Sequence, residues 1–212
     1  MSRDRERSVP LWVRLTLFPP AWILAKLPGG CRRALCFVLG RLLFYGFPRR
    51  RYTMLSNLHH AFPGWTESRR RAIARRSAVS LVEMGAFSFV SPFLSRAWLQ
   101  RHIRFSEDAR RFIDDMNANP RPTLLLIPHV AMLETLTVLP AIKRVPAGAG
   151  FYRSLNQDGI DAYVRYARAK WGFELLARKQ GLARGLSRLR RNMMVGILFD
   201  QNAGPAGAAV LS

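Results

Sequence analysis

The order of apolar and polar positions separates an N-terminal region from a longer region with alternating helix and strand patterns. Apolar residues dominate from Leu11 to Leu27 and again from Ala34 to Phe47. Lys26 and two prolines interrupt the first run and Arg41 interrupts the second, whereas about 20 mostly apolar residues are needed to cross a bilayer. We therefore expect interfacial or re-entrant membrane anchors, or a weak single span.

The middle of the chain changes from a helical to a strand pattern. Thr66-Glu67-Ser68 is a helix-start signal, and a basic amphipathic stretch follows it, which suits either a solvated charged face or contact with anionic headgroups. Thr123 to Ile127 is a short apolar run bounded by prolines, which predicts a buried strand. A helix is expected after it through Leu139, and then a turn rich in proline and glycine.

Helix and strand patterns continue to alternate in the C-terminal part. A short strand is expected near Phe151, a helix over 160–171, a second helix over 182–193 and a buried strand over 195–199. This alternation predicts an α/β fold with a mixed, largely parallel sheet flanked by helices. We expect a membrane anchor region at 1–48 and one catalytic domain at 49–212.

The charge balance narrows the class of partner. The chain has 34 Lys and Arg against 13 Asp and Glu, a formal charge of +21, so it favours an anionic partner such as a nucleic acid, an anionic membrane, a phosphorylated lipid or an acidic protein. No zinc finger, basic zipper or RNA-recognition signature is present, which argues against nucleic acid. Cys31 and Cys36, the only cysteines, form neither a disulfide framework nor a zinc motif.

His129 and Glu134 are the candidate catalytic pair. They follow the predicted strand of 123–127, and strand ends in α/β sheets are common ligand sites. Five residues of helix rotate by about 500°, so the two side chains could not share one helix face, and we expect His129 in the turn before the helix. A neutral histidine can take a proton from a hydroxyl, and a carboxylate fixes its tautomer. The spacing alone is a weak signal that more often marks a structural histidine.

Distributed motifs resemble the late acyltransferases of lipid A biosynthesis, the lauroyl and myristoyl transferases. These motifs are Arg50-Arg51 with Asn57-Leu58 and Phe62-Pro63, then His129-x4-Glu134, Phe151-Tyr152-Arg153-Ser154-Leu155-Asn156, Arg178 with Gly181-Leu182, and Asp200-Gln201-Asn202-Ala203-Gly204-Pro205. They occur in the order and at about the distances of the family over roughly residues 10–210.

The resemblance implies an enzyme of the inner membrane, active on its cytoplasmic face. Such enzymes move an acyl chain from acyl carrier protein to a hydroxyl of a phosphorylated lipid A precursor, without a cofactor or a metal ion. His129 and Glu134 match the catalytic dyad of the family, and Arg153, Asn156, Asp200 and Gln201 match its substrate-binding motifs.

The chain departs from the family pattern in two places. Val130 to Leu133 lack the Gly-Asn-Trp common within the family motif, so the acceptor is less certain than the reaction. The chain also stops at Ser212, where the family continues through an aromatic-glycine strand and further helices, so we expect a truncated member. The alternatives are another lipid or glycolipid acceptor and a basic nucleic-acid-binding protein.

Overall fold

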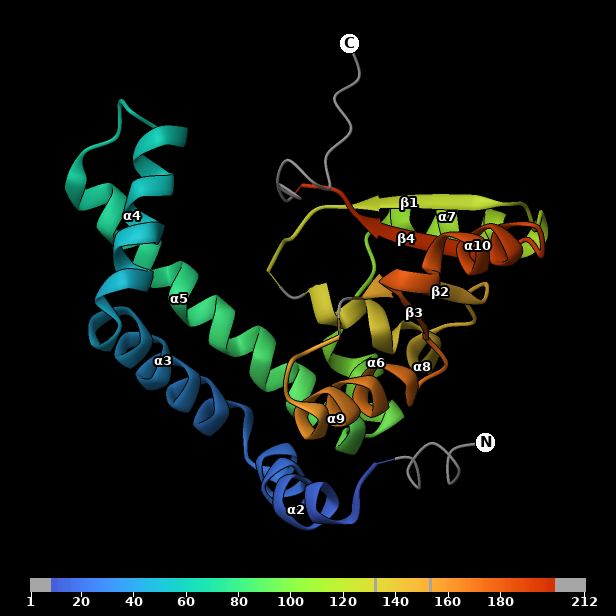
Figure 1. The fold of residues 1–212 in the computed structure, drawn as a ribbon, viewed down its shortest axis with the longest axis horizontal. Helices are drawn as coiled ribbons and strands as arrows, with labels where there is room; N and C mark the ends of the chain where they lie inside the picture. Colours follow the sequence, from blue (N-terminus) through green and yellow to red (C-terminus); the bar gives the residue numbers. More distant parts are fainter. Residues whose placement is uncertain (1–8, 132, 153, 201–212) are drawn as a thin grey trace.

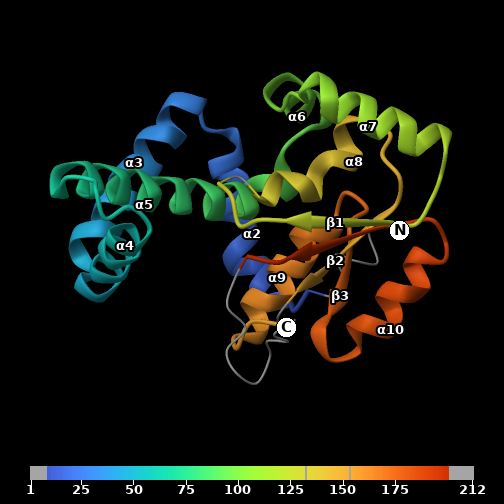
Figure 2. The same ribbon diagram turned by 90° about the horizontal axis from the view of Figure 1, so that it is seen from above.

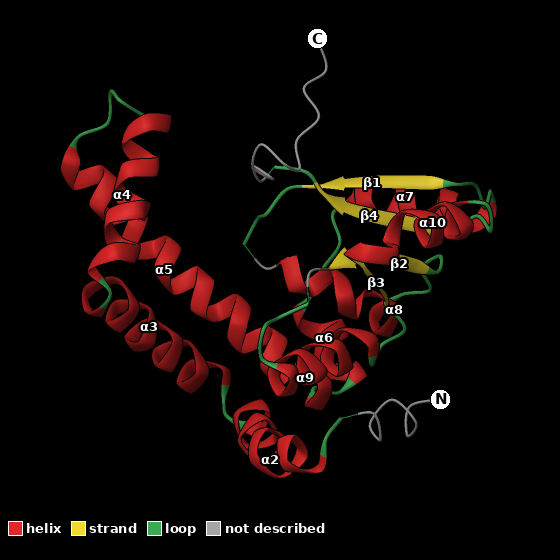
Figure 3. Ribbon diagram, in the orientation of Figure 1, coloured by secondary structure: helices red, strands yellow, loops and turns green. Residues whose placement is uncertain are grey.

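The computed structural model describes residues 9–131, 133–152 and 154–200. Its first half contains, in chain order, α2 (Leu11–Lys26), α3 (Gly29–Gly46), α4 (Pro48–Ala61), α5 (Glu67–Val90), the 3-10 helix η1 (Ser91–Phe93), α6 (Arg96–His102) and α7 (Glu107–Ala118). Its second half contains β1 (Thr123–Ile127), the 3-10 helix η2 (Leu133–Val138), α8 (Leu139–Ile142), β2 (Gly148–Tyr152), α9 (Asp158–Ala169), β3 (Glu174–Ala177), α10 (Arg178–Leu189) and β4 (Met194–Leu198). Figure 3 shows that the strands lie together in this second half.

The strands form one parallel sheet in the order β1-β4-β2-β3. In the pair of β1 and β4, the register runs from Thr123 beside Met194 to Ile127 beside Leu198. In Figure 2, α6, α7 and α8 lie on one side of the sheet, and α9 and α10 lie on the other. The predicted α/β class is therefore confirmed, and the parallel order brings the carboxyl ends of β1 and β4 to the same edge.

The prediction that β1 is a buried strand is wrong for one of its faces. β1 is an edge strand, and its alternate side chains point to opposite sides. Leu124 and Leu126 are 51% and 61% exposed, while Thr123, Leu125 and Ile127 are partly buried. The apolar run identified the strand but not its place in the sheet.

Two further local predictions need correction. The expected helix through Leu139 is the 3-10 helix η2 followed by the short α8, and Pro140 lies in the first turn of α8, where its missing N–H is tolerated. Gly148 and Gly150 lie in β2 and not in a turn. A Cβ on Gly150 would lie 2.8 Å from Cζ of Phe173, so the glycine lets the strand approach this ring closely.

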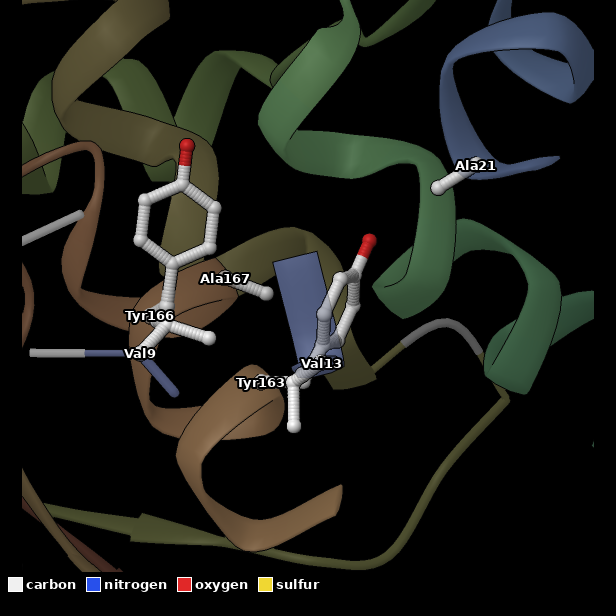
Figure 4. Packing of buried hydrophobic residues seen from close by; sticks show 6 residues of the cluster. All are labelled: Val9, Val13, Ala21, Tyr163, Tyr166 and Ala167. Carbon is white, nitrogen blue, oxygen red and sulfur yellow. The ribbon is translucent and has the colours of Figure 1, made fainter. Parts of the chain in front are cut away.

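The N-terminal helix packs against the helix that follows β2. Val9, Val13 and Ala21 form a buried cluster with Tyr163, Tyr166 and Ala167 of α9, shown in Figure 4. The hydroxyl of Tyr163 donates to the carbonyl of Phe89 at 2.5 Å, and burial raises the pKa of this phenol. This cluster fixes α2 beside the half of the chain that contains the sheet.

Helices α3, α4 and α5 form an arm that extends away from the sheet in Figure 1. The predicted helix start is confirmed, because α5 begins at Glu67 and the Thr66 hydroxyl accepts from the amide of Arg69 at 3.3 Å. Gly40 of α3 lies against the backbone of Val79, so α3 and α5 pack closely. Among the described helices, none has both the length and the apolar composition required to span a bilayer.

Candidate active site

A close polar contact at the carboxyl edge of the sheet joins His129 and Asp200. His129 follows β1 and Asp200 follows β4, two neighbouring parallel strands. The backbone N–H of His129 donates to Oδ2 of Asp200 at 2.7 Å, and its ring Nδ1 lies 2.6 Å from Oδ1. Both side chains are about one third exposed. The carboxylate thus holds both the backbone and the ring of His129 at a site that solutes can reach.

The charge of Asp200 determines which ring nitrogen of His129 carries the proton. Hydrogen bonds from the His129 side chain, and then from its backbone N–H, lower the pKa of Asp200 below its usual range. An ionised carboxylate only accepts hydrogen bonds, so Nδ1 carries a proton, and in the neutral ring the free lone pair is on Nε2. His129 is therefore oriented to accept a proton at Nε2.

Glu134 lies in η2, and its hydrogen bonds go to a different partner. Its carboxylate is 8% exposed and accepts from Nη2 and Nε of Arg168 at 2.5 and 3.0 Å. The Ser88 hydroxyl of α5 lies 3.4 Å from the same carboxylate. This bidentate pair joins η2 to α9 and compensates the burial of a charged group.

The structure does not place the carboxylate of Glu134 on the ring of His129. Nδ1 of His129 contacts Asp200. The carboxylate of Glu134 instead accepts hydrogen bonds from Arg168 and Ser88. His129 lies before η2, as the spacing argument predicted, and Glu134 lies inside that helix. The role of Glu134 as the partner of His129 remains a prediction from the sequence.

A cavity of about 500 Å³ lies beside the pair of Glu134 and Arg168. Its lining comes from α2, α5, η2, β2 and α9, and includes Leu17, Gly85, Phe89, Ile160 and Val164. An apolar cavity with one buried ion pair is suited to a ligand with a hydrocarbon part and a polar group.

Of the other predicted site residues, Asn156 is among the described residues, and Arg153 and Gln201 are not. Asn156 is exposed in the loop between β2 and α9. In the same loop, the amide of Leu155 donates to the buried Asp161 at 2.9 Å. The described residues include no group of three His, Cys, Asp or Glu placed to hold a metal ion.

Sequence reasoning missed Arg168 and Ser88, and only Arg168 had a usable signal. On α9, Arg165 pairs with Asp161 four residues earlier, with Nε 2.9 Å from Oδ2. This i,i+4 pairing could be inferred from the sequence. The residue four positions before Arg168 is Val164, which has no charge, so an acid partner of Arg168 has to come from another element.

Comparisons with known proteins relate the chain to one family. A family described as "Bacterial lipid A biosynthesis acyltransferase" has a model that matches residues 7–211. A curated protein of Haemophilus influenzae, "Lipid A biosynthesis acyltransferase", is 23% identical over 184 residues. The alignment covers 86% of this chain and 56% of that relative, so the chain spans about half of the relative's length.

Proposed function

Since this chain belongs to the bacterial lipid A biosynthesis acyltransferase family, we propose that it transfers a fatty acyl chain to a hydroxyl of a lipid A precursor. The observation that carries the proposal is the contact of His129 with Asp200 at the carboxyl edge of the sheet. Ligands of open α/β sheets bind at this edge. The donor we propose is the thioester of acyl carrier protein.

His129 acts as the general base in this proposal. Nε2 takes the proton of the acceptor hydroxyl as its oxygen attacks the thioester carbonyl, and Asp200 stabilises the imidazolium that forms. The tetrahedral intermediate then collapses, the C–S bond breaks, and the proton passes from His129 to the departing thiolate. The ester and the free thiol are the products, and no bond to the protein forms.

Glu134 is the second acid of the proposed site. In the structure its carboxylate accepts two hydrogen bonds from Arg168, and in the proposed pair it turns from Arg168 toward His129. Such an exchange has a physical trigger, since an anionic substrate group near Arg168 would compete for the guanidinium. We assign Glu134 to the catalytic pair with His129, as the sequence predicted, and Arg153, Asn156 and Gln201 to substrate binding. Asp200, which the sequence also assigned to substrate binding, is instead proposed to hold His129.

The surface of α2 and α3 supports association with a membrane. Large apolar side chains of both helices are at least 40% exposed, among them Leu11, Trp12, Leu15, Trp22, Ile23, Leu35, Phe37, Val38, Leu39 and Leu42. When exposed apolar side chains of this size gather on a surface, they mark a protein or membrane contact. Lys26 and Arg41 lie over the rings of Trp22 and Phe37, and cations with aromatic residues suit the headgroup region. We infer attachment to the cytoplasmic face of the inner membrane.

The positive charge also fits the proposed donor. Acyl carrier protein is acidic, and a net charge of +21 would accelerate its encounter with this chain at low salt. Raising the ionic strength should therefore lower the rate at subsaturating donor more than the rate at saturation.

A lipid mass spectrum of cells with and without the gene tests the proposed function. Loss of one acyl chain from lipid A in cells without the gene is the expected result. Unchanged lipid A together with the loss of an acyl chain from another lipid would assign the reaction to a different acceptor. Unchanged lipids of every class would contradict the proposed activity.

A further inference from the structure

A second, larger cavity lies beside α5, and its described lining contains none of the residues that the proposed chemistry uses. Its volume is about 1030 Å³, and α2, α3, α5, η1 and α6 form its walls. The lining is mainly apolar and includes Leu24, Leu35, Leu39, Val82, Phe93 and Trp98. This volume lies at the upper end of the range of about 300 to 1,000 Å³ for small-molecule sites, so the cavity can hold a long hydrocarbon chain.

Three basic side chains belong to the lining of this cavity. Lys26 of α2 and Arg32 and Arg33 of α3 belong to its lining, and the acid in the same lining is Glu83. The guanidinium of Arg32 lies 4.9 Å from the centre of the Trp98 ring and donates to the carbonyl of Ala25 at 3.0 Å. An apolar cavity with an excess of positive charge complements an amphiphile with an anionic headgroup.

The cavity is separate from the candidate active site. His129, Glu134, Arg168 and Asp200 are absent from its described lining, and Gly85 and Phe89 of α5 are shared with the smaller cavity beside Glu134. The apolar outer surfaces of α2 and α3 flank it, and hydrocarbon from a bilayer could therefore enter from these helices.

We propose that this cavity binds one anionic membrane phospholipid, with an acyl chain between α3 and α5 and the phosphate on Lys26, Arg32 and Arg33. A guanidinium can bind two phosphate oxygens at once, and the guanidinium of Arg32 is already oriented by its contacts with Trp98 and Ala25. The bound lipid would fill a cavity whose lining is mainly apolar. It would thereby join α2 and α3 to α5 and α6.

Quenching of Trp98 by a brominated lipid tests the proposal. The purified chain in a neutral detergent is titrated with phosphatidylglycerol that carries bromine on its acyl chains. Quenching should saturate, and Trp98→Phe should remove part of the quenched fluorescence. Arg32→Gln with Arg33→Gln should weaken the apparent affinity roughly 25-fold, because each cation near an anionic lipid contributes about fivefold.

Arg49→Gln with Arg50→Gln is the matched control, because it removes the same charge from α4 and α4 does not line the cavity. This control and His129→Ala should both keep the wild-type affinity. A circular dichroism spectrum checks that each variant folds. Leu35→Phe, which narrows the cavity from an exposed position without adding a tryptophan, gives a second route to lost binding.

Three results would overturn the proposal. The first is equal quenching of the wild type and Trp98→Phe. The second is equal affinity for brominated phosphatidylcholine and phosphatidylglycerol with no effect of the arginine pair. The third is displacement of the brominated lipid by the lipid A precursor at the concentration that saturates acyl transfer, which would assign the cavity to the reaction's own substrate.

Discussion

At the scale of single residues, the contact of His129 with Asp200 connects the fold to the proposed chemistry. The sequence predicted His129 at the end of a strand, and the structure confirms that position. The contact with Asp200 could not be predicted, because the two residues are 71 positions apart. They meet only because β4 lies beside β1, and strand order is a property of the whole sheet.

Asp200→Asn should slow the reaction while leaving the fold intact. An amide can donate to Nδ1, which favours the wrong tautomer, and it cannot stabilise an imidazolium. We expect turnover to fall on the order of a hundredfold, near the lower end of what general base catalysis supplies. Asp108→Asn, an exposed acid at the start of α7, is the control, and equal turnover of both variants would refute the role of Asp200.

The lowered pKa of Asp200 gives this contact a defined pH dependence. A group whose pKa is lower in the folded state stabilises the fold at pH values above its unfolded pKa, near 4, and this contribution is lost as the pH falls through the folded pKa. The difference in unfolding free energy between the wild type and Asp200→Asn should therefore shrink as the pH falls below about 4. Urea titrations at several pH values measure this difference.

Arg168→Gln should destabilise the protein through Glu134. The buried carboxylate would lose two charge-assisted hydrogen bonds, at a cost of roughly 1–3 kcal/mol. Adding Glu134→Gln removes the unpaired charge, so the double variant should be more stable than the sum of the two single losses. Additive losses in urea denaturation would show that the pair is not coupled.

At the scale of secondary structure, periodicity predicted the type of most elements in the second half. The strand of 123–127 and the helices over 160–171 and 182–193 are close to β1, α9 and α10. β3 was missed because Glu174 to Ala177 is too short to show a period of its own, and it pairs with β2 through tertiary contacts. Prediction of local structure failed where packing decided it, as at Gly150 beside Phe173.

Gly40→Ala should separate α3 from α5. The added Cβ would lie 2.5 Å from Cα of Val79, a backbone atom that cannot rotate away, so overpacking should cost roughly 1–3 kcal/mol. Gly30→Ala in the first turn of the same helix is the control, because nothing lies within 4 Å of its added Cβ. A fall in the midpoint of thermal unfolding for Gly40→Ala alone is expected, and equal midpoints would contradict the close packing.

At the scale of the whole molecule, the family and the fold class predicted from the sequence are confirmed. Neither prediction depends on knowing the register of the sheet. Distributed motifs are enough to identify the family, and alternating helix and strand patterns are enough to identify the α/β class. The separation of an anchor at 1–48 from a catalytic domain at 49–212 remains a prediction. In the structure, α2 packs against α9, and α3 packs against α5.

Trp22→Ser with Phe37→Ser should weaken binding to vesicles of phosphatidylglycerol and phosphatidylcholine. Both side chains are about half exposed, and each should contribute roughly 1 kcal/mol or more when a membrane covers it. The vesicle-bound fraction in co-sedimentation should therefore correspond to an affinity about tenfold lower or more. Leu182→Ser with Leu186→Ser on α10 is the control, and an equal loss there would contradict a specific role for α2 and α3.

The catalytic role of His129 is tested most directly by acyl transfer from acyl carrier protein to a lipid A precursor, with the product measured by mass spectrometry. The purified chain should form an ester on the precursor, and His129→Ala should reduce turnover by about 10²- to 10⁴-fold while its circular dichroism spectrum stays unchanged. Normal turnover of His129→Ala would contradict the account.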